Sequence, residues 1–172
     1  MFVDECGSHT ALTPLYGWAP RRERAVGRAP RNRGQNTTIV GALSVAGIGA
    51  AMTLEGAADR LAFEAFVEFF LVPNLKAGQI VVMDNLSIHK GPKVRSLIEE
   101  CGCNLLFLPS YSPDFSPIEP ARSKLKAHLR QVGARTKDTL DAAIGDGLNR
   151  INAQDAQGWF RHCGYSLLPH LL

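Results

Sequence analysis

Short apolar runs separated by turn residues dominate the first third of the chain, a pattern typical of β-strands. The first run covers residues 1–6, and two more cover 37–44 and 50–54, with glycines marking the turn between them. Residues 8–36 are rich in Pro, Gly and Arg, and they are expected to form a long hairpin excursion with one short strand near 24–27. We therefore expect an antiparallel meander at the start of the domain.

Strand and helix patterns alternate in the rest of the chain. Asp59 is expected to begin a helix that ends at Pro73, because apolar residues recur there at three- and four-residue spacing. The other expected elements are, in chain order, a strand at 80–83, a short helix from 91 to 102, a strand at 105–108 and two final helices at 117–132 and 136–151. This order predicts an α/β fold with one mixed sheet flanked by helices, in a single domain over residues 1–172.

The composition is that of an ordinary globular domain, with 45% apolar and 20% charged residues among 172. No apolar stretch has the length of a membrane span, and the N-terminus carries no visible secretory signal, so a cytoplasmic protein is expected. The four cysteines lack the paired spacing of zinc ligands and are expected to be reduced thiols.

The net charge is only +3, but the basic residues are clustered. The clusters are Arg21, Arg22, Arg24, Arg28, Arg31 and Arg33; Lys90, Lys93 and Arg95; and Lys124, Lys126 and Arg130. Such clusters suit a polyanion, although a solvated surface would explain any one of them. The residues predicted to contact DNA are Arg21, Arg22, His89, Lys90, Lys124, Lys126 and Arg130. Trp18 is expected to pack at the base of the hairpin, with stacking on a base as the alternative.

Three acidic residues occupy places where packing gives no reason for a charge. Asp4 interrupts an apolar strand, Asp84 follows another, and Glu119 begins a basic amphipathic segment. A carboxylate in or at the end of a buried strand costs free energy unless it is paired, hydrogen-bonded or bound to a metal ion. Hard oxygen ligands that converge from separate elements suit magnesium or manganese. The three acids together predict a two-metal site for phosphodiester chemistry.

Two of these acids have neighbours that bear on the prediction. Asp84 and Asn85 after a strand also form a common Asx-turn, which would explain the acid without any catalysis. Glu5 lies next to Asp4, but strand alternation should point the two side chains to opposite faces of the sheet. Only one of the pair is therefore expected at the site, and we choose Asp4.

Glu119 has a structural alternative of its own. Residues 116–119, Ser-Pro-Ile-Glu, match a capping box in which the Glu reaches back to the helix N-terminus. The same helix also places Glu119 at the head of a basic row formed by Arg122, Lys126 and Arg130. This row suits a metal ligand beside a phosphate backbone, which we favour over the cap. Asp114 is the main rival for the third acid, but its Ser-Pro-Asp turn explains it.

With these motifs in place, the chain resembles the catalytic domain of mariner-type DDE transposases, in their bacterial insertion-sequence branch. The matching strings are FVDECG at 2–7, YGWAP at 16–20, VVMDNLSIHK at 81–90 and LPSYSPDFSPIEPARSKLK at 108–126. A stretch of 34 residues separates Asp84 from Glu119, a spacing that is characteristic of this superfamily. The resemblance spans nearly the whole chain.

The resemblance implies a ribonuclease H-like fold with Asp4, Asp84 and Glu119 as catalytic residues that bind two Mg²⁺ or Mn²⁺ ions. It also implies metal-dependent cleavage and strand transfer of the DNA of an insertion sequence. The expected partners are the element ends and target DNA, with a homodimer assembled on them. A transposase of this branch would act at the bacterial nucleoid.

The chain departs from the family pattern in two ways. Family members usually carry a Trp just before the Ser-Lys-Leu-Lys stretch, where this chain has Ala121-Arg122. They also carry helix-turn-helix modules upstream of the first catalytic strand, which here starts at residue 2. We therefore expect looser packing beside Glu119, and a DNA-reading part that is missing, truncated or encoded separately as another subunit or frame.

Two other functions are compatible with the same residues. One is a ribonuclease H-like nuclease that acts on other nucleic acid, such as RNA–DNA hybrids, and needs no element ends. The other is an inactive or regulatory transposase fragment that binds DNA through its basic clusters. Cleavage of a hybrid would favour the first, and a failure to bind manganese would favour the second.

Overall fold

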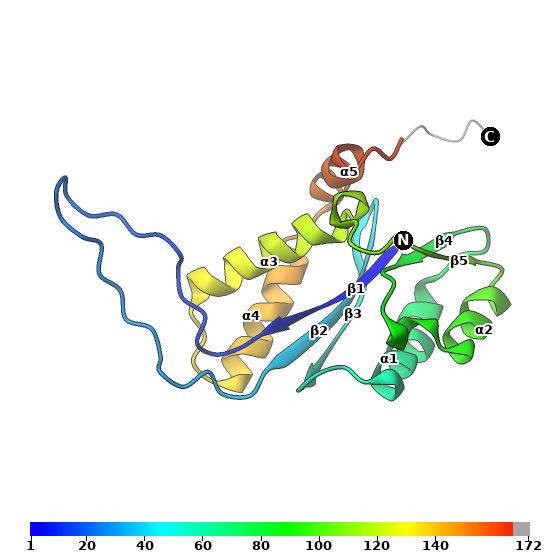
Figure 1. Ribbon diagram of the computed structural model, residues 1–172, viewed down its shortest axis with the longest axis horizontal. Helices are drawn as coiled ribbons and strands as arrows, with labels where there is room; N and C mark the ends of the chain where they lie inside the picture. Colours follow the sequence, from blue (N-terminus) through cyan, green and yellow to red (C-terminus); the bar gives the residue numbers. More distant parts are fainter. Residues whose placement is uncertain (167–172) are drawn as a thin grey trace.

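The computed structural model describes residues 1–166, and its centre is one five-stranded sheet in the order β3-β2-β1-β4-β5 (Figure 1). The strands are β1 (Phe2–Ser8), β2 (Thr37–Ser44), β3 (Gly47–Glu55), β4 (Ile80–Met83) and β5 (Asn104–Phe107). The first three pair antiparallel, whereas β4 runs parallel to both β1 and β5. The prediction of a mixed sheet flanked by helices is confirmed.

Helices cover both faces of this sheet (Figure 1). One face carries α1 (Arg60–Phe66), its continuation through a π-helical turn η1 (Val67–Leu71) and a 3₁₀ turn η2 (Val72–Asn74), and α2 (Pro92–Glu100). The other carries α3 (Ile118–Val132), α4 (Lys137–Asn149) and α5 (Ala153–His162). Two 3₁₀ turns, η3 (Ser87–Lys90) and η4 (Pro113–Phe115), follow β4 and β5. Within residues 1–166, every helix is too short or too polar to cross a membrane.

Strand alternation sends neighbouring side chains of β1 into two separate cores. Val3 packs with Phe63 and Phe66 of α1 on one face of the sheet. Phe2 packs on the other face against Phe160 of α5, with ring centroids 5.4 Å apart. Because both faces are buried, β1 is held firmly in place, and the acids on this strand are held with it.

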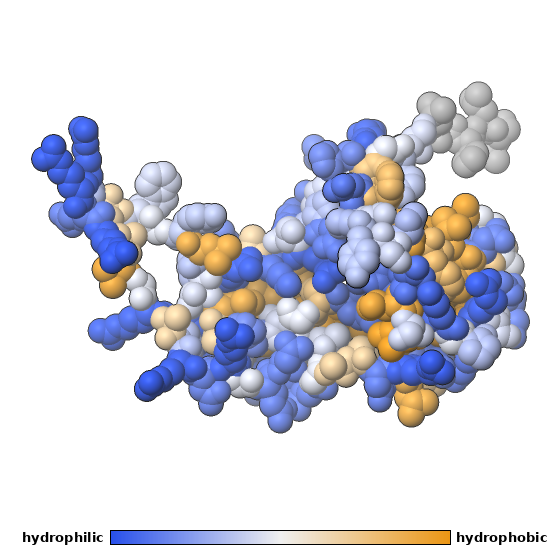
Figure 2. All heavy atoms as spheres, in the orientation of Figure 1, coloured by the Kyte–Doolittle hydropathy of each residue, from blue (hydrophilic) through white to orange (hydrophobic). Residues whose placement is uncertain are grey.

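Residues 9–36 form an exposed arm that projects from the sheet between β1 and β2 (Figure 1, left). Figure 2 shows that hydrophilic residues make up much of its surface. The prediction of a strand near 24–27 is wrong, because the arm pairs with no neighbouring strand there. The prediction that Trp18 packs at the base of the hairpin is also wrong, because its side chain is fully exposed.

The base of the arm is tied to the loop between α3 and α4. Arg135 Nη1 donates hydrogen bonds to the carbonyl oxygens of Thr10 and Leu12, each 2.9 Å long. On the other side, Thr10 Oγ1 donates to the carbonyl oxygen of Arg33 at 3.2 Å. These contacts fix where the arm leaves the domain and leave its middle free to meet a partner.

A further helix follows the two that the sequence predicts at the end of the chain. Asn152 and Asp155 form a reciprocal capping box at the start of α5, and Ala156 and Phe160 are buried against the sheet. The prediction that only two helices finish the chain is therefore wrong. The Asn-x-x-Asp cap was the signal that could have found this helix.

Gly47 is the position in β3 where a side chain is least tolerable. Its φ is +112°, and a Cβ atom there would lie 2.8 Å from the carbonyl oxygen of Ile151. Gly47→Ala should lower the free energy of unfolding by about 2 kcal/mol, because both the backbone and the contact become strained. Gly49→Ala is the matched control in the same strand, since a Cβ there meets no atom within 4 Å. Urea denaturation of both variants checks this, and equal losses would contradict the argument.

Candidate active site

The parallel register of β1 and β4 brings two of the predicted acids side by side. Phe2 pairs with Val82 and Val3 pairs with Met83, so Asp4 and Asp84 are the next residues along each strand. Adjacent strands lie about 4.8 Å apart, which places the two carboxylates at one edge of the ladder. Burial is the largest cause of the raised pKa of Asp4, and the negative charge of Asp84 raises it further.

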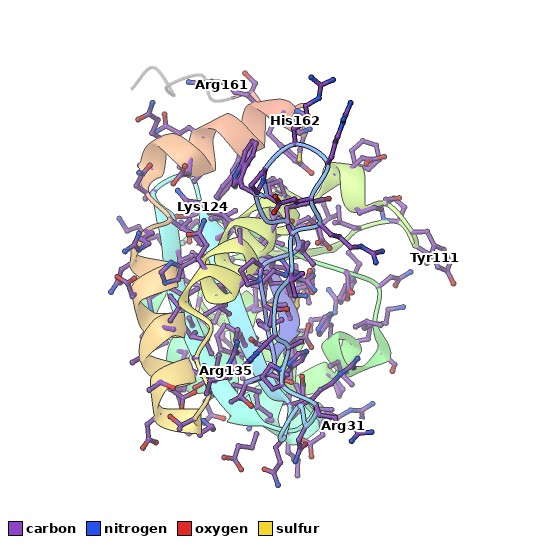
Figure 3. All side chains as sticks on the ribbon, turned by 90° about the vertical axis from the view of Figure 1, so that its left-hand side faces the viewer. Arg31, Tyr111, Lys124, Arg135, Arg161 and His162 are labelled. Carbon is purple, nitrogen blue, oxygen red and sulfur yellow. The ribbon has the colours of Figure 1, made fainter. Side chains whose placement is uncertain are left out.

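A single open cleft connects all three predicted acids. It has a volume of about 750 Å³, and its lining includes Asp4, Asp84 and Glu119. The same cleft is lined by the loop after β5, where the exposed Tyr111 projects from the rim (Figure 3). Residues from β1, from the turn after β4 and from α3 thus line one cleft, although they are far apart along the chain.

Arg122 lies between two of these acids. Its Nη1 donates a hydrogen bond to Oε1 of Glu119 at 3.1 Å, and it also donates to Oδ2 of Asp4. The other oxygen of Asp4, Oδ1, accepts from the backbone N–H of Glu5 at 2.7 Å. The guanidinium therefore offsets part of the negative charge on the Asp4–Glu119 side of the cleft.

The donor set suits a hard divalent ion. Oxygen ligands from three separate elements face one cleft, and the Arg122 cation shows that the Asp4–Glu119 pair accepts a positive charge between its carboxylates. Within residues 1–166, no three acidic, His or Cys side chains are close enough together to hold a metal ion as they stand. A metal ion would therefore require the side chains of Arg122 and the acids to rearrange.

The environment of Asp4 differs from that of an ordinary surface carboxylate. Burial raises the pKa of Asp4 to about 6, although the Arg122 guanidinium and the Glu5 N–H act in the opposite direction. A carboxyl group with a raised pKa that faces a cleft is a candidate for a functional site. Asp4 still carries its negative charge at neutral pH, as a metal ligand must.

His89 is completely buried and contacts two carboxylates at once. Its Nε2 lies 2.9 Å from Oε2 of Glu5, and its Nδ1 lies 2.6 Å from Oδ1 of Asp84. Burial alone would lower the pKa of His89, but the contacts with Asp84 and Glu5 outweigh it and raise the pKa to about 9. His89 is thus an imidazolium at neutral pH that links the two strands, with the Phe63 ring 4.3 Å away.

This burial corrects the prediction that His89 contacts DNA. A side chain with 0% exposure, held between Glu5 and Asp84, is unable to reach a phosphate outside the domain. Glu5 contacts His89, but it also lines the same cleft as Asp4, so the prediction that only one of this pair lies at the site is wrong. Sequence reasoning also missed the role of Glu5 as the partner of His89. The signal was present: a Glu beside Asp4 and a His five residues after Asp84.

Asp84 makes the contact of an Asx-turn and also lines the cleft. Its Oδ1 accepts a hydrogen bond from the Leu86 N–H at 3.0 Å, which is the Asx-turn contact. Burial would raise the pKa of Asp84, but the contacts with His89 and the Leu86 N–H hold it below its usual value. The turn and the cleft therefore use the same carboxylate, which is kept ionised.

Glu119 does not cap its helix. Pro117 is the N-cap residue of α3, and no side chain bonds to the first turn. The carboxylate instead accepts from Arg122, one turn further along α3. The capping-box alternative is therefore absent from the structure. The rival acid Asp114 lies in the 3₁₀ turn η4 and is exposed.

The predicted DNA-contacting residues lie in different surroundings. Arg21 and Arg22 are exposed in the arm, and Lys90 is exposed with its Nζ 5.9 Å from the centre of the Phe107 ring. Lys126 and Arg130 are partly buried on α3. Lys124 lies 2.5 Å from Asp155 of α5, and Figure 3 shows it on the side of α3 opposite Tyr111. Its charge is therefore already paired and directed away from the cleft.

Known structures share this architecture. The chain is similar to the strand transfer complex of Mos1 transposase (TM-score 0.71, 16% identity, covering 94% of this chain and 51% of that chain). It is also similar to the Mos1 mariner paired end complex with Mn, with a TM-score of 0.69 and 15% identity, covering 94% of this chain and 51% of that chain. A third similar structure is the Mos1 transposase catalytic domain with raltegravir and Mg, with a TM-score of 0.64 and 12% identity, covering 94% of this chain and 76% of that chain. At these identities the likeness establishes the fold, and the chain spans about half the length of the transposase complexes it matches.

A mixed sheet with Asp4 within β1, Asp84 directly after the parallel strand β4, and helices on both faces has the ribonuclease H-like fold of these structures. The family model of the DDE superfamily endonucleases matches residues 1–141, and the chain belongs to that family. No curated protein sequence gives a significant match. The resemblance to DDE transposases that the motifs indicate is confirmed at the level of the family.

Proposed function

We propose that this chain is the catalytic domain of a DNA transposase that cleaves and joins the DNA of a bacterial insertion sequence. The observation that carries the proposal is the convergence of Asp4, Asp84 and Glu119 on one cleft of a DDE endonuclease fold. Neighbouring folds with Mg and Mn support the use of a divalent metal. The nucleoid of a bacterial cell is the corresponding site of action.

Different residues of the cleft have different roles in the proposed reaction. Two Mg²⁺ or Mn²⁺ ions held by Asp4, Asp84 and Glu119 would supply activation of the attacking oxygen and stabilisation of the leaving oxygen. His89, which also contacts Glu5, holds Asp84 in position. No protein nucleophile is needed, since water first attacks the strand and the freed 3′-hydroxyl then attacks the target in the same cleft.

We assign DNA binding to basic residues of the arm, of η3 and of α3. The exposed arginines of the arm, such as Arg21 and Arg22, and Lys90 at the end of η3 can bind phosphates. Lys126 and Arg130 extend the basic row on α3. The exposed Trp18 supplies an aromatic face on which a base can stack. Two copies acting on paired element ends, with helix-turn-helix modules supplied upstream or by a separate subunit, complete the proposed assembly.

The ion pairs of Arg122 favour one second candidate, a DNA-binding domain without catalytic activity. They fill the space between Asp4 and Glu119 with a guanidinium, at a position where the family usually has a Trp. Such a domain would still bind DNA through the arm. Manganese binding and strand cleavage both distinguish it from the active enzyme.

Metal-dependent DNA cleavage tests the proposal. The purified chain should nick supercoiled plasmid in Mn²⁺ or Mg²⁺ and leave 3′-hydroxyl ends, while EDTA or Ca²⁺ should lower the rate by at least about a hundredfold, because only the transition state needs the correct ion geometry. Gel assays with end-labelled DNA measure this. An RNA–DNA hybrid serves as the comparison substrate: preferential cleavage of the hybrid would favour the ribonuclease H-like alternative. The absence of any nicking would count against the enzyme.

A further inference from the structure

One guanidinium nitrogen contacts both carboxylates on the α3 side of the cleft. Nη1 of Arg122 donates to Oδ2 of Asp4 and to Oε1 of Glu119, the latter at 3.1 Å. An ion bound between these carboxylates would need the same oxygens. The guanidinium and a divalent metal ion are therefore unable to hold this position at the same time.

The contact is also sheltered enough to be strong. The side chains of Arg122 and Asp4 are only 25% and 13% exposed, so solvent screens their attraction less than that of a surface pair. Arg122 follows Glu119 by three residues on α3, so the helix itself holds the guanidinium beside its carboxylate. The neighbouring Ala121 is buried with Ile118 and Phe2, which fixes the rotation of this helix turn.

We propose that Arg122 is a built-in competitor for the divalent metal ion, and that metal binding requires its guanidinium to leave Asp4 and Glu119. This inference rests on the proposed function, because it assumes that the acids of the cleft bind the metal. The free chain then holds metal more weakly than its carboxylates allow. The residue that departs from the family pattern thereby sets the metal affinity of the site.

Two substitutions separate the charge of Arg122 from its size. Arg122→Met keeps a long, flexible side chain but removes the cation, whereas Arg122→Lys keeps the cation. Mn²⁺ binding to the folded chain without DNA is measured by the loss of the electron paramagnetic resonance signal of free Mn²⁺. We expect Arg122→Met to bind at least about tenfold more tightly than the wild type, and Arg122→Lys to differ by less than about threefold.

The controls test the location and the nature of the effect. Arg161→Met removes one positive charge from the exposed surface of α5 and should change the affinity by less than about twofold. Asp84→Asn, combined with Arg122→Met, should abolish the tighter binding if the metal lies at the acids. Circular dichroism checks that each variant folds, and Arg122→Gln replaces Arg122→Met if that variant does not.

The outcomes distinguish this inference from the proposed function. Equal Mn²⁺ affinity of the wild type and the folded Arg122→Met or Arg122→Gln variant overturns the competition, while the proposed function stands. Tighter binding that survives Asp84→Asn also overturns it, since the metal then lies elsewhere. Failure of every variant to bind Mn²⁺ overturns the metal site and the competition together.

Discussion

Asp84→Asn should lower the rate of metal-dependent DNA cleavage by at least about a thousandfold while the domain stays folded. The substitution removes one negative charge from the proposed ion site beside β1 and β4, and an amide oxygen binds a hard divalent ion far more weakly. The fold should survive because His89 keeps its second carboxylate partner, Glu5, on the opposite nitrogen. The cleavage rate under single-turnover conditions and the thermal melting curve are the two measurements.

Asp114→Asn is the matched control for this experiment. Asp114 undergoes the same change of charge, but it lies exposed in η4. Its variant should cleave DNA within about threefold of the wild-type rate, since a lone surface charge acts weakly at a distance. If Asp84→Asn retained wild-type cleavage, the assignment of Asp4, Asp84 and Glu119 as the catalytic acids would be wrong.

His89→Gln should lower the free energy of unfolding by about 3 kcal/mol near pH 6.5, the largest loss of stability expected for a single polar residue here. The pKa of His89 rises from 6.5 in the unfolded chain to about 9 in the folded domain. Its stabilising effect is therefore complete below pH 6.5 and is lost as the pH rises through about 9. Urea denaturation at pH 6.5, 8 and 9.5 should show the wild type and the variant converging.

Two further variants make this test specific. His162→Gln, on the exposed surface of α5, should leave both the stability and its pH dependence unchanged. Glu5→Gln should remove part of the same interaction, so the double variant with His89→Gln should lose less stability than the two single losses added together. A stability difference that stayed constant from pH 6.5 to 9.5 would show that His89 contributes through packing and not through its charge.

The strands and helices with clear hydrophobic patterns could be predicted from the sequence. Apolar runs predicted β1, β2 and β4, but strand alternation did not exclude Glu5 from the site, because Asp4 and Glu5 both line the cleft. The order of strands and helices was enough to define the mixed sheet. The order and spacing of the acid motifs were enough to indicate the family, although the assignment of each acid to the site stays a prediction.

Contacts between distant segments were beyond the reach of the sequence. Arg122 meets Asp4 across 118 positions, and His89 meets Glu5 across 84, so no local periodicity encodes either contact. His89 followed a turn and resembled a surface residue, but the fold closes α1 over it. The prediction for Trp18 was wrong for the opposite reason. A large apolar side chain is usually buried, but Trp18 lies in the arm, where its side chain is fully exposed.

The way in which the sheet holds the two ends of the arm allows the arm to vary in length and sequence. The β1–β2 ladder runs without interruption to the pair Ser8 and Thr37, so the two ends of the arm are already held together by the sheet. Lengthening, shortening or replacing residues between them costs little closure entropy and leaves the strand register untouched. The arm can therefore be replaced, by evolution or by grafting, without a change in the strands that carry the acids of the cleft.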